Sequence, residues 1–180
     1  MTTVPGEPAP VPVRHQRRLA VLVLVASLVV MVSGLIAWSR TGPSAAQLRA
    51  QTRDAVLSAA KLDIATLNTL DYRTVKNGIA EWESRSTGKL HDQLAAVTPQ
   101  EMQLLAEQKK ISVGRVVDAG VLSLDNDTAT VIASVEVTVK DATSPASTPT
   151  IKRNRFTADL ARVGGDWKLE NLQQVPVNIS

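Results

Sequence analysis

Residues 129–139 read ATVIASVEVTV, with small or β-branched apolar residues at every second position from Ala129 to Val139. An apolar period of two is typical of a strand that buries one of its two faces. A single unbroken phase over this length is the clearest strand pattern in the chain. This stretch therefore predicts a β-sheet in the C-terminal half.

Similar alternation on both sides of this strand predicts an antiparallel meander. Residues 111–121 alternate and the following leucines change phase, which predicts a bulge or bend at Gly120. A polar loop over 141–149 and a further strand lead to a turn at 164–166. The last strand begins with Trp167, which we expect to fill the core just past that turn.

Upstream of the sheet the apolar period changes to 3.6, which predicts helices. The predicted helices cover residues 45–70, 73–86, 90–96 and 99–110. Gly88 is expected to end the second helix as a left-handed cap residue. Thr98-Pro99-Gln100-Glu101 is a capping box with proline at the first helical position, so it predicts the start of the last helix. Helices followed by a meander predict an α+β domain, with the helices packed on one face of a curved antiparallel sheet.

Residues 19–38 read LAVLVLVASLVVMVSGLIAW and carry no charged side chain. A helix of this length spans roughly 30 Å, the thickness of a bilayer core, so the segment predicts a membrane span. The apolar run is longer than that of a signal peptide and no A-x-A-like site follows, which favours an uncleaved anchor. Arg14, Arg17 and Arg18 precede the span and predict a cytoplasmic N-terminus.

These features predict three parts of the chain. Residues 1–18 are expected to be a disordered cytoplasmic tail, since prolines recur among small residues. Residues 19–38 are the expected transmembrane helix. Residues 39–180 are the expected extracytoplasmic α+β domain, which places the protein in the cell membrane as a single-pass protein.

Composition excludes several functional classes. The 180-residue chain has no cysteine, so disulfides, zinc ribbons and thiol nucleophiles are absent. The formal net charge is +3, but from Ser39 onward 17 Lys and Arg residues face 16 Asp and Glu residues. Nucleic-acid binding needs a basic stripe, so no nucleic-acid partner is expected.

The titratable residues do not predict a catalytic or metal site. His91 stands beside Asp92 on a polar helix and is expected to be solvated, because a metal site needs three or four ligands. Glu81 and Glu83 are two positions apart and point to different sides of a helix, so they form no acid–base pair. We therefore expect no enzyme activity, no metal and no cofactor.

A series of short motifs in this order and spacing resembles the Mce-associated membrane proteins of actinobacteria. They are Asp71-Tyr72-Arg73, Thr87-Gly88, Gly114 with Val116, Ala119-Gly120-Val121, Ala129-Thr130-Val131, Arg155 and Gly165-Asp166-Trp167. The resemblance spans the anchor and nearly the whole outer domain, and departs at Leu94, where relatives tend to carry an aromatic. It implies a nuclear transport factor 2-like cone and an accessory role beside a mammalian-cell-entry (Mce) lipid transporter.

The residues that carry the resemblance also have structural explanations. Asp71 is a predicted helix N-cap, Arg73 a surface or ion-pairing residue, and Tyr72 a core residue with its polar tip at the surface. Together with Gly88, Gly120 and Trp167 they are interpreted as fold-specifying or interface residues.

Three functional classes follow. The first is an anchored accessory subunit that contacts other subunits of a lipid transport complex. The second is an extracytoplasmic domain that binds an apolar small molecule or lipid in the sheet concavity. The third is an enzyme related to the ketosteroid isomerases, which needs a carboxylate base opposite a Tyr or a protonated acid. A single tyrosine in the chain disfavours the third class.

Overall fold

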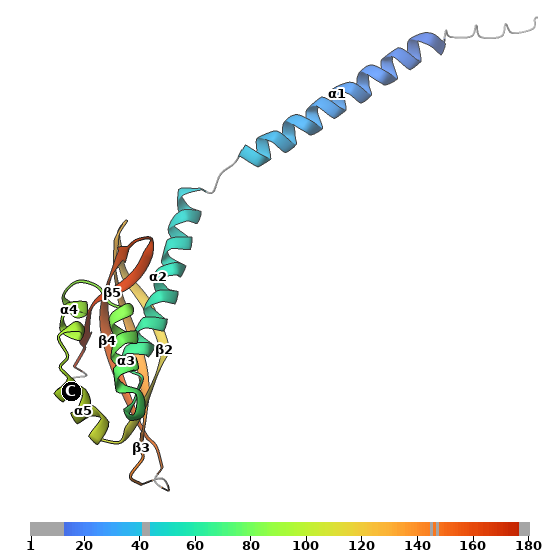
Figure 1. Ribbon diagram of the computed structural model, residues 1–180. Coiled ribbons are helices and arrows are strands. Elements are labelled where there is room, and N and C mark those ends of the chain that lie inside the picture. The colour runs from blue at the N-terminus through green and yellow to red at the C-terminus, as the bar shows by residue number, and fades with distance from the viewer. Residues whose placement is uncertain (1–12, 41–43, 145, 147, 177–180) are drawn as a thin grey trace, which may run out of the picture. The chain divides into compact units, whose positions relative to one another are not determined.

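The structure is a computed structural model that describes residues 13–40, 44–144, 146 and 148–176; for 13–22 and 37–40 it describes the backbone alone. The chain forms two compact units, Met1–Gln47 and Leu48–Ser180. Figure 1 shows the elements of each unit.

Helix α1 spans Val13–Arg40 and contains the whole predicted membrane segment, residues 19–38. It also includes residues 13–18, which the sequence predicts to belong to a disordered tail; residues 1–12 of that tail lie outside the described residues. Large apolar side chains between Val23 and Ile36 are exposed. Within the residues whose side chains the structure describes, no helix is both long and apolar enough to span a bilayer.

Helix α2 spans Ala45–Leu67 and ends three residues before the predicted end. The side-chain amide of Asn68 donates to the Ile64 carbonyl at 2.8 Å, and the Thr69 amide donates to the Thr66 carbonyl at 2.9 Å. These bonds turn the chain into the short strand β1, Leu70–Asp71, which the sequence did not predict.

Three short helices and a 3₁₀ turn follow. They are the 3₁₀ turn η1 (Tyr72–Thr74), α3 (Val75–Ser84), α4 (Gly88–Ala95) and α5 (Pro99–Glu107). The predicted capping box is present, with the Thr98 amide donating to Glu101 Oε2 at 2.8 Å. Helix α5 ends sooner than predicted because Lys109, at φ 49°, turns the chain into the sheet.

The prediction that Gly88 ends a helix is wrong, although its φ of +55° is left-handed as expected. Helix α3 already ends at Ser84, and Gly88 begins α4. The cause lies in the segment between them: Ser86 forms a bridge with Leu169, and the Thr87 amide donates to the Leu169 carbonyl at 2.8 Å. This pairing with the sheet interrupts the helix.

Within the described residues the sheet has five strands in the order β1-β2-β3-β4-β5, all antiparallel, which confirms the predicted meander. The four long strands are β2 (Lys110–Leu124), β3 (Thr128–Asp141), β4 (Thr150–Val163) and β5 (Asp166–Gln174). The predicted irregularity at Gly120 is misplaced, because Gly120 pairs regularly with Ile132. The register instead shifts between Val116 and Asp118 and between Val121 and Ser123.

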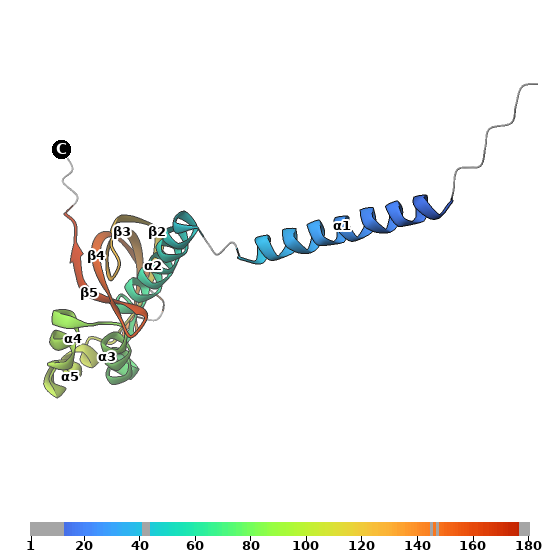
Figure 2. The ribbon, with the colours of Figure 1, turned by 90° about the horizontal axis from the view of Figure 1, so that it is seen from above.

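The core lies between α2 and the inner face of the sheet. Alternate residues of β3, from Ala129 to Val137, are buried together with Val56, Ala60 and Ile64 of α2. Figures 1 and 2 show α2 against one side of the curved sheet, with α3, α4 and α5 grouped together. This arrangement confirms the α+β class and leaves the opposite side of the sheet as an outer face.

Candidate functional site

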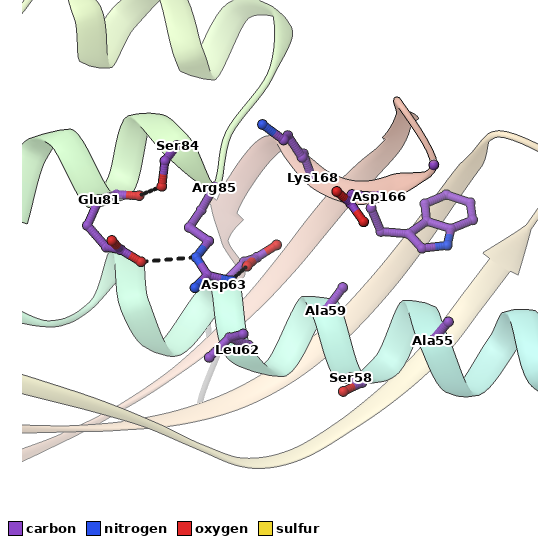
Figure 3. A pocket seen from close by; sticks show the side chains of 12 residues that line it. Ala55, Ser58, Ala59, Leu62, Asp63, Glu81, Ser84, Arg85, Asp166 and Lys168 are labelled. Atoms are coloured by element: carbon purple, nitrogen blue, oxygen red, sulfur yellow. Dashed lines mark hydrogen bonds and ion pairs between the residues drawn. The ribbon is translucent and has the colours of Figure 1, made fainter.

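A cleft of about 690 Å³ lies between α2, the C-terminal end of α3 and the start of β5. Figure 3 shows charged side chains from all three elements meeting there. The ionisable lining residues are Asp63, Glu81, Arg85, Asp166 and Lys168, and the others are Ala55, Ser58, Ala59, Leu62, Ser84, Gly165 and Trp167.

Asp63 lies on the buried side of α2, and only 3% of its side chain is exposed. Arg85 Nη1 lies 3.5 Å from Asp63 Oδ1, a long contact for an ion pair of this kind. Burial is the largest influence on this carboxyl and raises its pKa from 3.8 to about 6, although Arg85 and Lys168 oppose the increase. Removing a carboxylate from water disfavours its charged form, so a proton on Asp63 stabilises the folded state.

Arg85 connects this carboxyl to two other elements. Its Nε donates to Glu81 Oε1 at 3.1 Å, one helical turn back on α3. Its backbone carbonyl accepts from the Leu169 amide of β5 at 3.1 Å. Asp63 of α2, the end of α3 and β5 are therefore joined through one residue.

This arrangement is chemically suited to holding elements together. A pKa near 6 would serve a general base, and such perturbed groups often mark functional sites. However, the Asp63 carboxyl already faces Arg85, and Tyr72 is not among the lining residues. The cleft thus brings charged groups, including the carboxylates of Glu81 and Asp166, into a joint between α2, α3 and β5, and Arg85 contacts the Asp63 carboxyl.

Sequence reasoning missed Asp63, although a signal for it exists. On α2 the apolar stripe runs through Val56, Ala60, Ile64 and Leu67, and Asp63 falls at the helical spacing of that stripe. An acidic residue on an apolar helix face requires a buried partner. That partner, Arg85, is 22 residues away and could not be identified from spacing.

The structure places the motif Asp71-Tyr72-Arg73 elsewhere, at the surface. Asp71 caps η1 by accepting from the Arg73 amide at 2.9 Å, as predicted. Hydrogen bonds from Arg73 lower the pKa of the Asp71 carboxyl. The Arg73 guanidinium also lies 5.8 Å from the centre of the half-buried Tyr72 ring. These three residues form one local unit that orders the entry into α3.

The other residues singled out from the sequence lie apart. Trp167 is 8% exposed in the core cluster and lines the cleft, whereas Gly88 begins α4 and Gly120 lies within β2. Their role as interface residues stays a prediction. Trp82, a half-buried residue of α3, donates from Nε1 to the Thr66 carbonyl at 2.8 Å.

His91 is less solvated than predicted. Its ring is half-buried, and Nδ1 lies 3.1 Å from the Glu83 carbonyl oxygen. The carboxylates of Glu81 and Glu83 point to different side chains, as their spacing predicts. Glu81 Oε1 lies 3.1 Å from Arg85 Nε, and Glu83 Oε1 lies 3.9 Å from His91 Nε2. In the part of the chain that the structure describes, no three His, Asp or Glu side chains gather as metal ligands.

Comparisons with known proteins give a family and a fold. The family model described as "Uncharacterized protein Rv1363c/MT1408-like" matches residues 16–176. Uncharacterized protein Rv1363c of Mycobacterium tuberculosis is 23% identical over 164 residues, which cover 88% of this chain and 61% of that protein. The chain thus spans less than two thirds of the length of this relative.

Two solved structures are similar to the folded domain. One is an IcmL-like type IV secretion system protein from Legionella pneumophila, with a TM-score of 0.54 and 16% identity, covering 77% of this chain and 97% of that chain. The other is the VirB8 protein of Agrobacterium tumefaciens, with a TM-score of 0.54 and 10% identity, covering 77% and 99% of the respective chains. These similarities show a shared α+β fold.

Proposed function

The chain belongs to the Rv1363c/MT1408-like family, and we propose that it acts as a membrane-anchored accessory subunit of an envelope complex, which it stabilises through protein–protein contacts. The observation that carries this proposal is the fold that the chain shares with a type IV secretion system protein over 77% of its length. That neighbour is named as a protein of a type IV secretion system. An accessory role of the same general kind needs a folded domain, an anchor and an exposed contact surface.

We propose that α1 supplies the anchor. Between Val23 and Ile36 its large apolar side chains are exposed to solvent in the structure, which in water is unfavourable over such an area. The hydroxyls of Ser27 and Ser33 donate to carbonyls within the helix, at 2.9 Å to Leu24 and 2.6 Å to Val29. Both features suit a helix in hydrocarbon. The arginines that precede the span, Arg14, Arg17 and Arg18, favour a cytoplasmic N-terminus, with residues 39–180 outside the cytoplasm.

The finer proposal is that the complex is an Mce-type lipid transporter. It rests on the resemblance to Mce-associated membrane proteins carried by the motifs from Asp71 to Trp167. The same resemblance supports a nuclear transport factor 2-like cone as the form of the outer domain. In this role the domain stabilises its partners by mass action, and the protein itself catalyses no reaction.

The packing of α2 favours this role over the binding of an apolar ligand. A ligand in the sheet concavity would occupy the space beside Val131 and Leu160 of the inner face. In the structure these two residues are at most 1% exposed, and the fully buried Val56, Ala60 and Ile64 of α2 pack in the same cluster.

The proposal is tested by deleting the gene in the cells that encode it. We expect lower amounts of the Mce transporter subunits and reduced uptake of an apolar substrate such as a sterol or a fatty acid. The wild-type gene supplied in trans should restore both, and an unrelated envelope transporter should be unaffected. Normal transporter levels and normal uptake in the deletion strain would contradict the proposal.

A further inference from the structure

The outer face of the sheet, opposite α2, carries a compact group of arginines. Strand pairing places Arg115 of β2 and Arg153 of β4 on either side of Glu136 of β3. Arg155 lies two residues further along β4, opposite Ser134. We call Arg115, Arg153, Arg155 and Glu136 the arginine patch.

Glu136 organises this patch. Only 18% of its side chain is exposed, and its two carboxylate oxygens contact different arginines. Arg115 Nη2 lies 3.6 Å from Oε1, and Arg153 Nε lies 3.2 Å from Oε2. Two guanidinium groups are thereby held on the sheet surface while 70% and 81% of their side chains stay exposed. Three positive charges face one negative charge, so the patch has a formal charge of +2.

Apolar side chains border the patch. Val113, Val117 and Ile151 are 52%, 57% and 56% exposed. Val117 lines a hollow of about 550 Å³ together with the four residues of the arginine patch. A sheet face that combines exposed β-branched residues with arginines resembles the composition of protein interfaces, where Arg is enriched.

We propose that the arginine patch binds an acidic segment of a partner protein, with the Asp or Glu carboxylates on the guanidinium groups and an apolar side chain beside Val117. Arginine binds carboxylates through two parallel hydrogen bonds, and guanidinium groups already held in place lose less entropy on binding. This inference rests on the proposed function, because it names the surface through which the accessory subunit contacts its complex.

The charge distribution favours a protein segment over an anionic membrane surface. Attraction to a membrane requires many basic residues, and from Ser39 onward the chain has nearly equal numbers of basic and acidic residues. Here the positive charge is confined to two adjacent rows of one sheet face and surrounds a fixed carboxylate. Such a local arrangement is complementary to a protein segment that carries a few Asp or Glu carboxylates at a defined spacing.

The test uses the full chain in its own cells, with a photo-reactive benzoylphenylalanine at Val117. We expect a cross-linked product whose mass spectrum maps to an Asp- or Glu-rich segment of another envelope protein. In the Arg153→Glu/Arg155→Glu variant the yield should fall at least about tenfold, because charge repulsion at an interface opposes association. The matched control is Lys76→Glu/Lys89→Glu, which changes the net charge equally at exposed sites on α3 and α4. It should leave the yield unchanged, with equal amounts of all variants in the membrane.

Several results would overturn this inference: a product with lipid, with a second copy of the chain or with a segment that is not acidic, a yield insensitive to charge reversal, or no product. If the cross-linked product is absent but deletion of the gene still lowers the amounts of the transporter subunits, the proposed role of the arginine patch is wrong and the proposed function stands. If the product maps to an acidic segment outside the transporter and deletion has no effect on transport, the patch stands and the proposed function fails.

Discussion

Asp63 and Arg85 meet at 3.5 Å across the boundary between α2 and α3, although 22 residues separate them in the sequence. The contact is unequal, because the Asp63 side chain is almost wholly buried whereas 35% of the Arg85 side chain is exposed. The cost of burying charge therefore falls mainly on Asp63. This asymmetry makes the stability of the domain sensitive to pH.

The first prediction is that Asp63→Asn removes a pH-dependent loss of stability. The pKa of Asp63 is raised from 3.8 to about 6. The stabilisation of the folded state by the protonated carboxyl is therefore fully present below pH 3.8 and is lost as the pH rises to about 6. This difference corresponds to about 3 kcal/mol in the free energy of unfolding. The Asp63→Asn variant does not titrate in this range, so its free energy of unfolding relative to wild type should increase by about this amount as the pH rises from about 4 to about 7.

Urea unfolding of the purified chain in mild detergent, followed by tryptophan fluorescence at several pH values, measures this difference. Asp54→Asn, at an exposed position of the same helix, is the control and should follow the wild-type curve. A constant difference between Asp63→Asn and wild type across this range would show that Asp63 has an ordinary pKa.

The second prediction concerns Arg85→Gln. Loss of the guanidinium removes the main group that lowers the pKa of Asp63, so that pKa should rise further above its ordinary value. At pH 7.5 we expect a loss of about 1–3 kcal/mol in the free energy of unfolding, less than for a fully buried pair because Arg85 is partly exposed. The loss should shrink at pH 5 and in the double variant with Asp63→Asn. Equal losses at both pH values would exclude this coupling.

The third prediction compares two glycines of β2. A Cβ at Gly114 would lie 2.8 Å from the Ala65 carbonyl oxygen and 2.5 Å from Asn68 Cβ, so α2 and the strand would have to separate. Gly114→Ala should therefore cost about 1–3 kcal/mol. A Cβ at Gly120 meets no atom within 4 Å among the described residues, so Gly120→Ala should be neutral or slightly stabilising. Thermal unfolding of both variants compares them, and equal melting temperatures would contradict the close approach at Gly114.

The fourth prediction compares Trp167→Ala with His91→Ala. Trp167 is buried in the core, and truncation of a buried aromatic residue typically costs about 3–5 kcal/mol. His91 is half-buried, and its ring contacts the Glu83 backbone carbonyl at 3.1 Å and lies 3.9 Å from the Glu83 carboxylate, so its removal should cost less than about 1 kcal/mol. Denaturant unfolding gives both values. A larger cost at His91 would mean that the ring has a role that its contacts do not reveal.

The meander could be predicted from the sequence because one local property, the period of two, determines which face of each strand is buried. Residues 129–139 follow this period throughout, and alternate residues of β3 are indeed buried. The capping box at Thr98 is equally local, since its hydrogen bonds join residues three apart. Such features need no knowledge of the tertiary structure.

The features that were missed depend on contacts between distant residues. Helix α3 ends at Ser84 because residues 85–87 pair with β5, more than 80 positions away in sequence. The two register shifts of β2 are defined only against β3. The phase change after residue 121 indicated one of them, between Val121 and Ser123, but its position was predicted at Gly120, and the shift between Val116 and Asp118 was missed. The candidate site depends on Asp63 and Arg85 in the same way, and the arginine patch requires the register of three strands.

The last prediction separates the contribution of α1 from that of the folded domain. Replacing residues 19–38 by an unrelated membrane span keeps the anchor but removes any specific contact made by the helix. The sequence spacing of Ser33, Gly34 and Ala37 predicts a small-residue face of the kind that lets helices approach closely. We expect the swapped protein to restore transporter levels and uptake in the deletion strain, because the proposed function assigns most of the interface to the domain from Ser44 onward. Quantitative immunoblots of the transporter subunits and uptake of a labelled sterol measure the outcome. If the swapped protein reaches the membrane in normal amounts and restores neither quantity, the interface lies in the membrane helix and the arginine patch is not its main part.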